Sequence, residues 1–153
     1  MFELFIPFFL LFLLILILAI IWRSNARKYI SSGTVASAYD AWTQDKLLER
    51  LWGEHIHLGF YPSGNKNIDF RKAKVQFVHE LVRWSDLDKL PKGSRILDVG
   101  CGIGGSSRIL AKYYGFNVTG ITISPAQVKR ARELTPSGLN CNFQVMDLSL
   151  IHI

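Results

Sequence analysis

The segment from Arg95 to Ala111 (RILDVGCGIGGSSRILA) constrains the fold of this chain more than any other. A short apolar stretch, typical of a buried strand, runs directly into a turn crowded with glycines, and a helical pattern follows. Glycine adopts positive φ angles without steric cost and lets a ligand approach the backbone closely. The segment therefore predicts a strand, a tight turn and a helix, with a ligand site at the turn.

The same alternation continues toward the end of the chain. NVTGITI is typical of a second strand, SPAQVKRARELT of a second helix and CNFQVMD of a third strand. Ser124 is a suitable N-cap, Pro125 occupies the first helical position, and Gln127 would complete a capping box. Strands that alternate with helices favour a parallel sheet with crossover helices, so we expect an α/β fold.

The glycine turn does not have the surroundings of a dinucleotide site. Gly100, Gly102 and Gly105 match the G-x-G-x-x-G pattern, which is a weak signal by itself. Asp98 argues against a dinucleotide, because a carboxylate at this turn would repel a pyrophosphate bound at the helix N-terminus. A nicotinamide site also expects an acid for the ribose at the end of the next strand, where this chain has Thr122.

The residues from Asp98 to Gly104 (DVGCGIG) instead follow the E/D-x-G-x-G-x-G pattern of S-adenosylmethionine sites. That cofactor has no phosphate, and it carries an ammonium and a sulfonium that a carboxylate attracts. We therefore predict S-adenosylmethionine as the cofactor, and no metal. The alternative is a purely structural strand-to-helix turn in which Asp98 contacts the helix N-terminus.

The residues from Leu4 to Trp22 form an uncharged, strongly apolar run. Because about 20 apolar residues in a helix span a bilayer, we expect a retained transmembrane anchor at residues 1–22, in contact with the lipid bilayer. A cleaved signal peptide is the alternative, but Glu3 precedes the run and basic residues follow it. Basic residues favour the cytoplasmic side, so the body is expected on the cytoplasmic or stromal side of a plasma or thylakoid membrane.

Behind the anchor we expect three further parts: a polar linker at residues 23–33, a helical lid region at 34–90 and a partial Rossmann-like domain at 91–153. The helices of the lid region could cover the site or pack against the sheet. Lys and Arg exceed Asp and Glu in the chain, which suits an anionic membrane or a solvated basic surface. The sequence has no basic run, zinc-ligand spacing or aromatic RNA-binding motif, so no nucleic-acid partner is predicted.

The stretch LDVGCGIGGSSRILAKYYGFNVTGITISPAQVKRARELT resembles the class I methyltransferases. With WGEHIHLGFY at Trp52–Tyr61, it is most similar to one branch of that family, whose members act on prenylated quinols, tocopherols, sterols and acyl chains. This branch has cyanobacterial members. The resemblance covers roughly Met1 to Asp147. It implies methylation of a carbon of a prenylated quinol, of the plastoquinone and tocopherol type. Methylation of another lipid (tocopherol, sterol or acyl chain) and a non-catalytic fragment are the alternatives.

The resemblance also defines the expected sheet. The family's sheet has seven strands in the order 3-2-1-4-5-7-6, of which this chain would hold the first three. We therefore expect an N-terminal transmembrane helix followed by the first part of a Rossmann-like sheet, with strands 3-2-1 only. The final six residues, LSLIHI, depart from the family's pattern, so we expect a truncated chain and leave its activity open. The oligomeric state is not indicated.

By position, the resemblance implies a set of residues around S-adenosylmethionine. The loop under its methionine part would be formed by Asp98, Gly100, Gly102 and Gly104. Thr122 and Ile123 would flank the ribose and the adenine.

Three further positions have two interpretations each. Gln127 resembles a glutamine that bonds the ribose, or it completes the capping box. Asp147 resembles the acid that accepts the adenine amino group, or it caps a following helix. Tyr39 resembles an aromatic residue that closes over the cofactor, or it is a core tyrosine.

Methyl transfer to a quinol ring would benefit from a base, because removal of a phenolic proton raises the electron density of the ring. His55 and His57 are the two histidines clustered near the expected edge of the cofactor, and they are the candidate catalytic residues. A structural role for both in their loop is the alternative.

Overall fold

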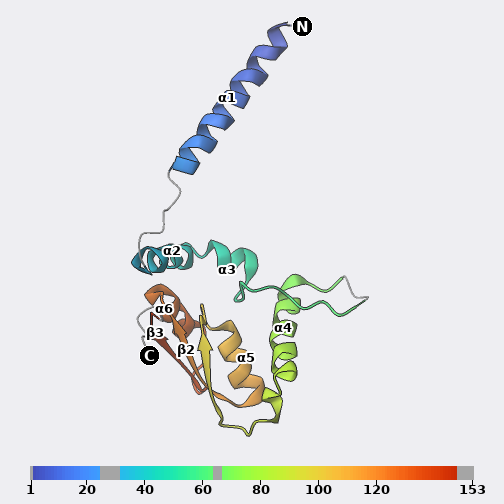
Figure 1. Ribbon diagram of the computed structural model, residues 1–153, viewed down its shortest axis with the longest axis vertical. Helices are drawn as coiled ribbons and strands as arrows, with labels where there is room; N and C mark the ends of the chain where they lie inside the picture. The colour runs from blue at the N-terminus through green and yellow to red at the C-terminus, as the bar shows by residue number, and fades with distance from the viewer. Residues whose placement is uncertain (1, 25–31, 64–66, 148–153) are drawn as a thin grey trace. The chain divides into compact units, whose positions relative to one another are not determined.

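The computed structural model describes residues 2–24, 32–63 and 67–147. The chain divides into two units, Met1–Ile30 and Ser31–Ile153, and the division falls inside the predicted linker. The first unit contains helix α1 (Phe2–Ser24). The second contains all three strands and the remaining helices (Figure 1).

The predicted transmembrane helix at residues 1–22 is wrong. No helix within the described ranges is long and apolar enough to cross a membrane. The predicted single-pass location, with the body on the cytoplasmic or stromal side of a plasma or thylakoid membrane, is wrong for the same reason.

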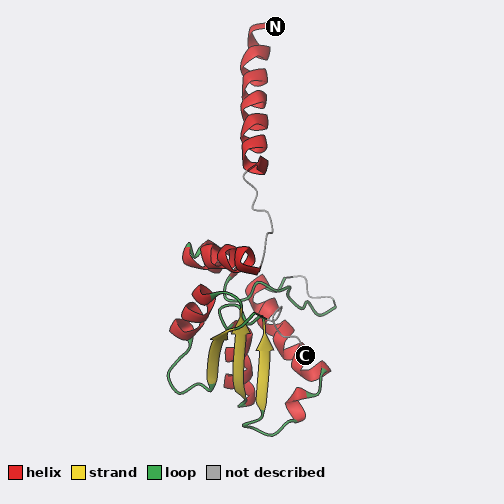
Figure 2. Ribbon diagram, turned by 60° about the vertical axis from the view of Figure 1, so that its left-hand side comes forward, coloured by secondary structure: helices red, strands yellow, loops and turns green. Residues whose placement is uncertain are grey.

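The second unit is built on a three-stranded parallel sheet (Figure 2). Its strands are β1 (Arg95–Val99), β2 (Asn117–Thr122) and β3 (Cys141–Val145), in the order β1-β2-β3. Asp98 pairs with Gly120 and Thr122 pairs with Val145, so the carboxyl ends of the strands meet at one edge of the sheet. The predicted α/β fold with a strand order of 3-2-1 is therefore present in this unit.

Local signals explain where the helices behind the strands begin and end. Helix α5 (Gly105–Tyr114) ends at Gly115, which adopts a left-handed φ of 73°. Helix α6 (Pro125–Leu134) begins after Ser124, whose hydroxyl accepts a hydrogen bond from the backbone N–H of Gln127. Helix α4 (Phe70–Trp84) begins in the same way after Asp69 and precedes a short 3₁₀ helix, η1 (Leu87–Lys89).

These helices build the core with the sheet. Val78 and Val82 of α4 pack with α5 and with Phe116 and Val118, beside and within β2. Phe143 of β3 packs with α6 in a second cluster. On β1, which is one of the two edge strands of this sheet, Leu97 and Val99 are exposed.

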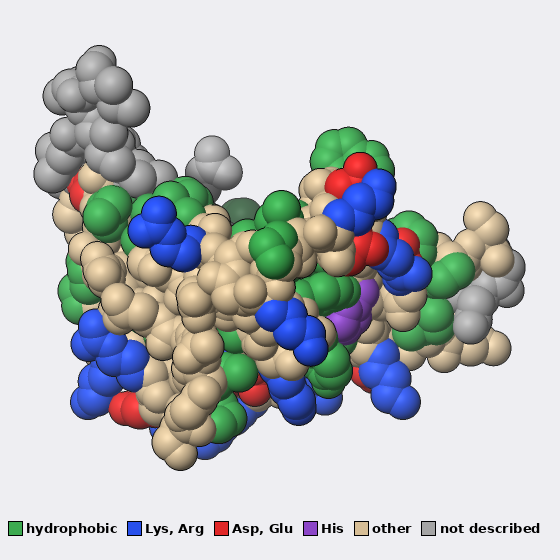
Figure 3. Space-filling model, turned by 90° about the horizontal axis from the view of Figure 1, so that it is seen from below, with side chains coloured by type: hydrophobic (Ala, Val, Ile, Leu, Met, Phe, Trp, Pro, Cys, Tyr) green, Lys and Arg blue, Asp and Glu red, His purple; other side chains and the backbone are tan. Residues whose placement is uncertain are grey.

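Helices α2 (Ser32–Gln44) and α3 (Leu47–Trp52) lie across the carboxyl ends of the strands (Figures 1 and 2). Lys46 separates them with a positive φ of 56°, which ends one helix and starts the next. On the face shown in Figure 3, Lys and Arg side chains are spread among acidic and apolar ones rather than gathered into one patch.

Candidate functional site

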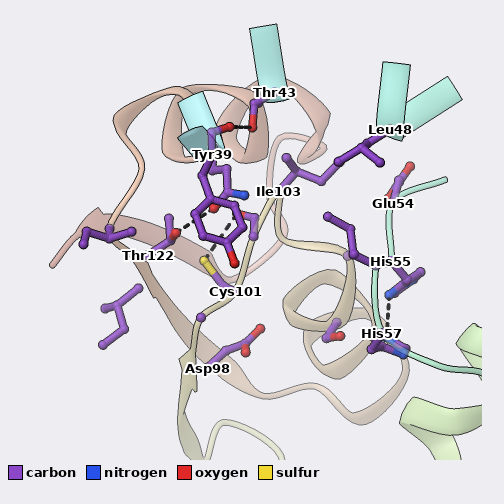
Figure 4. A pocket seen from close by; sticks show the side chains of 18 of the residues that line it. Tyr39, Thr43, Leu48, Glu54, His55, His57, Asp98, Cys101, Ile103 and Thr122 are labelled. Atoms are coloured by element: carbon purple, nitrogen blue, oxygen red, sulfur yellow. Dashed lines mark hydrogen bonds between the residues drawn. The ribbon is translucent and has the colours of Figure 1, made fainter. Parts of the chain in front are cut away.

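A cavity of about 470 Å³ lies between the α2–α3 segment and the carboxyl ends of the strands (Figure 4). Its size is within the range of small-molecule sites. Ten of the eleven predicted site residues line it, from five separate segments of the second unit: Tyr39, His55, His57, Asp98, Gly100, Gly102, Thr122, Ile123, Gln127 and Asp147. The fold therefore brings the sequence-predicted residues into one site, with the exception of Gly104.

Two glycines of the turn expose bare backbone to this cavity. Gly100 and Gly102 have φ angles of +75° and +55°, which disfavour other residues. A Cβ atom built on either glycine has no protein atom within 4 Å. Both glycines therefore leave room at the cavity wall that a ligand, rather than the protein, can use.

The next two glycines are required by packing instead. A Cβ on Gly104 would lie 2.6 Å from Cζ of the buried Phe143 ring, and its φ is +81°. A Cβ on Gly105 would lie 2.7 Å from the Glu54 carbonyl oxygen and 2.8 Å from Cε1 of His55. Gly104 is thus explained by close approach of the turn to β3, and Gly105 by close approach of the histidine loop to α5.

The carboxylate of Asp98, just before the glycine turn, is held in a fixed position. It is the fourth residue of β1 and is partly buried at the cavity wall. Ser107, fully buried in α5, donates its hydroxyl to Asp98 Oδ2 at 2.6 Å. One of the two carboxylate oxygens, Oδ2, is thus held in place by the protein.

Thr122 and Gln127 form a second polar pair. Thr122 Oγ1 donates to Gln127 Oε1 at 2.7 Å, and both side chains are buried. Ser124 caps α6, but its N–H lies 3.4 Å from Thr122 Oγ1, so the reciprocal bond of a capping box is not made. No buried side-chain nitrogen or oxygen in the described part of the chain lacks a hydrogen-bond partner. The unpaired Gln127 amide nitrogen is therefore accessible as a donor.

Aromatic and acidic residues close the remaining sides. Tyr39 on α2 is 37% exposed and packs edge-on against Trp42 at 5.4 Å between ring centroids. Tyr39 is therefore part of the cavity wall rather than of a buried core. Asp147 follows β3 and lines the cavity, as does Ile123 after β2.

The two candidate histidines lie in the loop after α3. His57 Nε2 is 3.1 Å from His55 Nδ1 (Figure 4). His57 Nδ1 is 2.8 Å from the Leu58 carbonyl oxygen. Burial, and then the nearby His57, lower the pKa of His55 from 6.5 to about 4. His55 is consequently a neutral imidazole at physiological pH.

Lys74 of α4 is hydrogen-bonded to the backbone of the same loop. It is 5% exposed, and its ammonium donates to the carbonyl oxygens of Trp52 at 3.1 Å and of His55 at 2.8 Å. The ammonium also lies 5.6 Å from the centroid of the Trp52 ring. Burial lowers the pKa of Lys74 below its ordinary value. The backbone of the histidine loop is thus fixed by a buried cation.

The ties between α2–α3 and the rest of the unit were missed by the sequence analysis. Asp40 of α2 accepts hydrogen bonds from the Ser124 hydroxyl at 2.5 Å and the Ala126 N–H at 3.0 Å, at the N-terminus of α6. Glu49 of α3 makes a two-bond contact with Arg130, at 2.6 and 2.9 Å. The hydrogen bond from Arg130 lowers the pKa of Glu49. These partners are more than 80 residues apart in the sequence, so no local pattern reveals them.

A third tie joins the loop to α5. Arg108, which is buried, donates to Glu54 Oε2 at 2.5 Å and to the Ile103 carbonyl oxygen at 2.8 Å. Cys101, in the glycine turn, is also buried, and burial raises the pKa of its thiol to about 12. Cys101 is therefore a packing residue and not a nucleophile.

Comparison with known proteins identifies the family. Residues 96–152 match the family described as a methyltransferase domain. The chain is 56% identical to 2-methyl-6-phytyl-1,4-hydroquinone methyltransferase from Synechocystis sp., over 93% of this chain and 45% of that protein. Residues 96–152 therefore belong to the methyltransferase domain family.

Two further comparisons extend this similarity. It is 41% identical to a probable chloroplastic tocopherol O-methyltransferase from Oryza sativa, over 74% of this chain and 33% of that protein. It matches the crystal structure of magnesium protoporphyrin IX methyltransferase from Synechocystis PCC 6803 with bound SAM, with 27% identity and a TM-score of 0.57. That match covers 84% of this chain and 59% of the other. The chain thus spans less than half the length of the curated relatives it matches.

The comparisons confirm the predicted resemblance to methyltransferases. The matched region of this chain contains the whole glycine turn, β2, β3 and all of β1 except Arg95, with Asp98 and Asp147 near the carboxyl ends of β1 and β3. The α2–α3 segment, which supplies Tyr39 and the histidine pair, lies outside that region but inside the match to the hydroquinone methyltransferase.

Proposed function

We propose that this methyltransferase binds S-adenosylmethionine in the cavity and serves methyl transfer to a ring carbon of a prenylated quinol. One observation carries the proposal. Gly100 and Gly102 present bare backbone to open space directly beside the carboxylate of Asp98. The combination suits a ligand that is cationic and packs closely, and it disfavours a pyrophosphate.

The residues of the turn fit the methionine part of the cofactor. Asp98 Oδ1 would accept from the ammonium group while Ser107 holds Oδ2. The backbone at Gly100 and Gly102 would lie against the methionine chain, where any side chain would occupy its place. Gly104 supports the turn through its contact with Phe143.

The ends of the second and third strands fit the nucleoside part. The Gln127 amide nitrogen would donate to a ribose hydroxyl, with Thr122 fixing the amide through its 2.7 Å bond. Ile123 would pack against the adenine, and Asp147 would accept from its amino group. Tyr39 would cover the cofactor from α2.

S-adenosylmethionine supplies an activated methyl group on a sulfonium, so the protein contributes mainly alignment of the acceptor. The acceptor class is supported by the relatives. Identity is 56% to a methyltransferase named for a phytyl hydroquinone and 41% to one named for tocopherol. O-methylation of a tocopherol is therefore the second candidate, and transfer to carbon of a quinol is the first.

Calorimetric titration with S-adenosylhomocysteine tests the cofactor site. We expect binding to the wild-type chain and a loss of about 10- to 100-fold in affinity for Asp98→Asn, because a hydrogen bond to a charged group contributes about 1.5–3 kcal/mol. Asp88→Asn, at an exposed acid in η1, is the matched control and should bind like the wild type. Unchanged affinity in D98N, or tighter binding of NADH than of S-adenosylhomocysteine, would contradict the proposal.

The acceptor is tested separately. With S-adenosylmethionine carrying a labelled methyl group, a phytyl hydroquinone and a tocopherol are offered in parallel, and mass spectrometry locates the label. Label on a ring carbon of the hydroquinone supports the first candidate. Label only on an oxygen of the tocopherol supports the second.

A further inference from the structure

The contacts of His57 fix where its protons lie. His57 Nδ1 is 2.8 Å from the carbonyl oxygen of Leu58. A carbonyl oxygen can only accept a hydrogen bond, so Nδ1 must carry a proton. In the neutral imidazole the other nitrogen, Nε2, then holds a lone pair and can only accept.

The orientation of His57 in turn fixes His55. His57 Nε2 lies 3.1 Å from His55 Nδ1, so His55 Nδ1 must be the donor of this bond. His55 Nε2 is then left with a lone pair. This nitrogen has no hydrogen-bond partner among the described residues, where no buried side-chain nitrogen or oxygen lacks one, so it is accessible. His55 also lines the cavity.

The surroundings keep His55 neutral and close to the glycine turn. Its ring lies where a Cβ atom on Gly105 would come within 2.8 Å of Cε1, and its carbonyl oxygen accepts a hydrogen bond from Lys74. Burial is the main reason that the pKa of His55 is lowered to about 4, and the neighbouring His57 lowers it further. Glu54 acts in the opposite direction, whereas Arg108 and Lys74 add to the lowering. A neutral imidazole with an accessible lone pair is thus available beside the proposed cofactor loop.

We propose that His55 and His57 form a two-histidine proton relay for the methyl acceptor, in which His55 accepts the hydroxyl proton and His57 takes up the charge. The proposal rests on the proposed function. The O–H bond of the quinol breaks and its proton binds His55 Nε2, while the proton on His55 Nδ1 moves to His57 Nε2. The electron pair stays on the quinol oxygen and enriches the ring.

After the transfer, His55 is again neutral, with its proton on Nε2, and His57 is an imidazolium that donates from both nitrogens. The positive charge therefore rests on His57, whose Nδ1–H is already bonded to the Leu58 carbonyl oxygen and whose ring packs against Phe77. The low pKa of His55 is then no obstacle, because His55 does not have to keep the charge. His57 acts through His55 and is a positioning residue.

Nitrogen NMR of the imidazole side chains in the full chain at pH 7.5 tests the relay. We expect His55 in the uncommon tautomer, with Nδ1 protonated and Nε2 bare, and His57 with Nδ1 protonated. In His57→Phe, His55 loses its acceptor and should change to the Nε2–H tautomer. His79, whose Nδ1 lies 2.7 Å from the Tyr114 hydroxyl outside the cavity, is the internal control and should not change.

A second variant separates orientation from proton uptake. In His57→Gln the amide oxygen can still accept from His55 Nδ1, so the tautomer should persist, but an amide cannot take up the proton. We expect the kcat of H57Q to fall by about 100-fold with little change in the KM of the acceptor, the range of general-base effects. A predominant Nε2–H tautomer of wild-type His55, or H57Q with wild-type kcat, would overturn the relay. The tautomers are measured without turnover, so failure of S-adenosylhomocysteine binding would refute the proposed function separately.

Discussion

The glycine turn yields a sharp contrast between two substitutions that look alike in the sequence, Gly102→Ala and Gly104→Ala. Both glycines have a positive φ, +55° and +81°, and alanine in this region costs about 1–2 kcal/mol. At Gly102 nothing else is added, because no protein atom lies within 4 Å of the new methyl group. At Gly104 the methyl group would lie 2.6 Å from Phe143 Cζ and 2.9 Å from Arg108 Nη1.

The additional cost at Gly104 is one of overpacking. Phe143 is 1% exposed and cannot move out of the way, and forcing an extra carbon into a packed core costs about 1–3 kcal/mol. We therefore expect the free energy of unfolding to fall by about 2–5 kcal/mol in G104A and by about 1–2 kcal/mol in G102A. Urea unfolding followed by circular dichroism measures both values.

Ligand binding should show the opposite order. The methyl group of G102A enters the open side of the turn, where the proposed cofactor lies, so S-adenosylhomocysteine affinity should fall by about tenfold or more, as expected for a group that displaces close contacts. G104A, measured at a temperature where it stays folded, should lose less. Equal destabilisation by both substitutions, or undiminished binding in G102A, would refute the reasoning.

A double-mutant cycle checks the assigned cause. Phe143→Leu removes ring atoms that the Gly104 methyl group would meet. The double variant should therefore be more stable than the sum of the two single effects predicts, with a coupling of about 1 kcal/mol. Additive effects would mean that strain at φ, and not contact with Phe143, accounts for the cost.

Three further predictions concern charged and titrating groups. Glu49→Gln should lower the free energy of unfolding by about 1–2 kcal/mol at pH 7. Because Arg130 lowers the Glu49 pKa, this difference in stability between the wild type and E49Q should be complete above pH 4.5, the ordinary pKa, and should vanish as the pH falls through the folded pKa. Urea titrations at several pH values measure it. Ser107→Ala should weaken S-adenosylhomocysteine binding by about threefold to tenfold, measured by calorimetry, because Asp98 loses the donor on Oδ2. His55 has a pKa of about 4 in the folded chain, against an ordinary value of 6.5, so the unfolded chain binds more protons between these pH values. The free energy of unfolding should therefore fall as the pH drops from 6.5 toward 4, by at most roughly 3 kcal/mol. The slope of stability against pH should be smaller in His55→Gln.

Strands, caps and the glycine turn could be predicted because their signals are local. The N-cap at Ser124, the proline after it and the helix-ending Gly115 each act within a few residues of their own position. The hydrophobic runs around them fix the alternation of strand and helix, and short right-handed crossovers then leave few sheet orders. The strand order itself was implied by the resemblance to the methyltransferases, and the observed order β1-β2-β3 agrees with it.

Hydropathy alone misled the prediction for the N-terminal run. The prediction of a membrane span rested on the apolar composition of residues 4–22 and on the lack of charged residues among them. Within the described ranges no helix is long and apolar enough to cross a membrane, so composition alone was not sufficient.

The glycine pattern was predicted as a unit, yet its glycines are required for different reasons. Gly100 and Gly102 face open space, whereas Gly104 and Gly105 make room for Phe143 and His55. A motif records which positions tolerate no side chain and does not record what would meet that side chain. The distinction depends on Phe143, 39 positions from Gly104, and on His55, 50 positions from Gly105, so it follows only from the fold.

The cavity itself depends on contacts of the same non-local kind. The strand ends supply one wall, and α2 with the histidine loop supplies the other. Asp40 joins the two walls at the point where ligand contacts are proposed, since it caps the helix that carries Gln127. A shift of α2 would therefore move Tyr39 and the N-terminus of α6 together, and the Thr122–Gln127 pair with them. The polar ties thus keep the two walls in register, which is the preorganisation that alignment of a methyl acceptor requires.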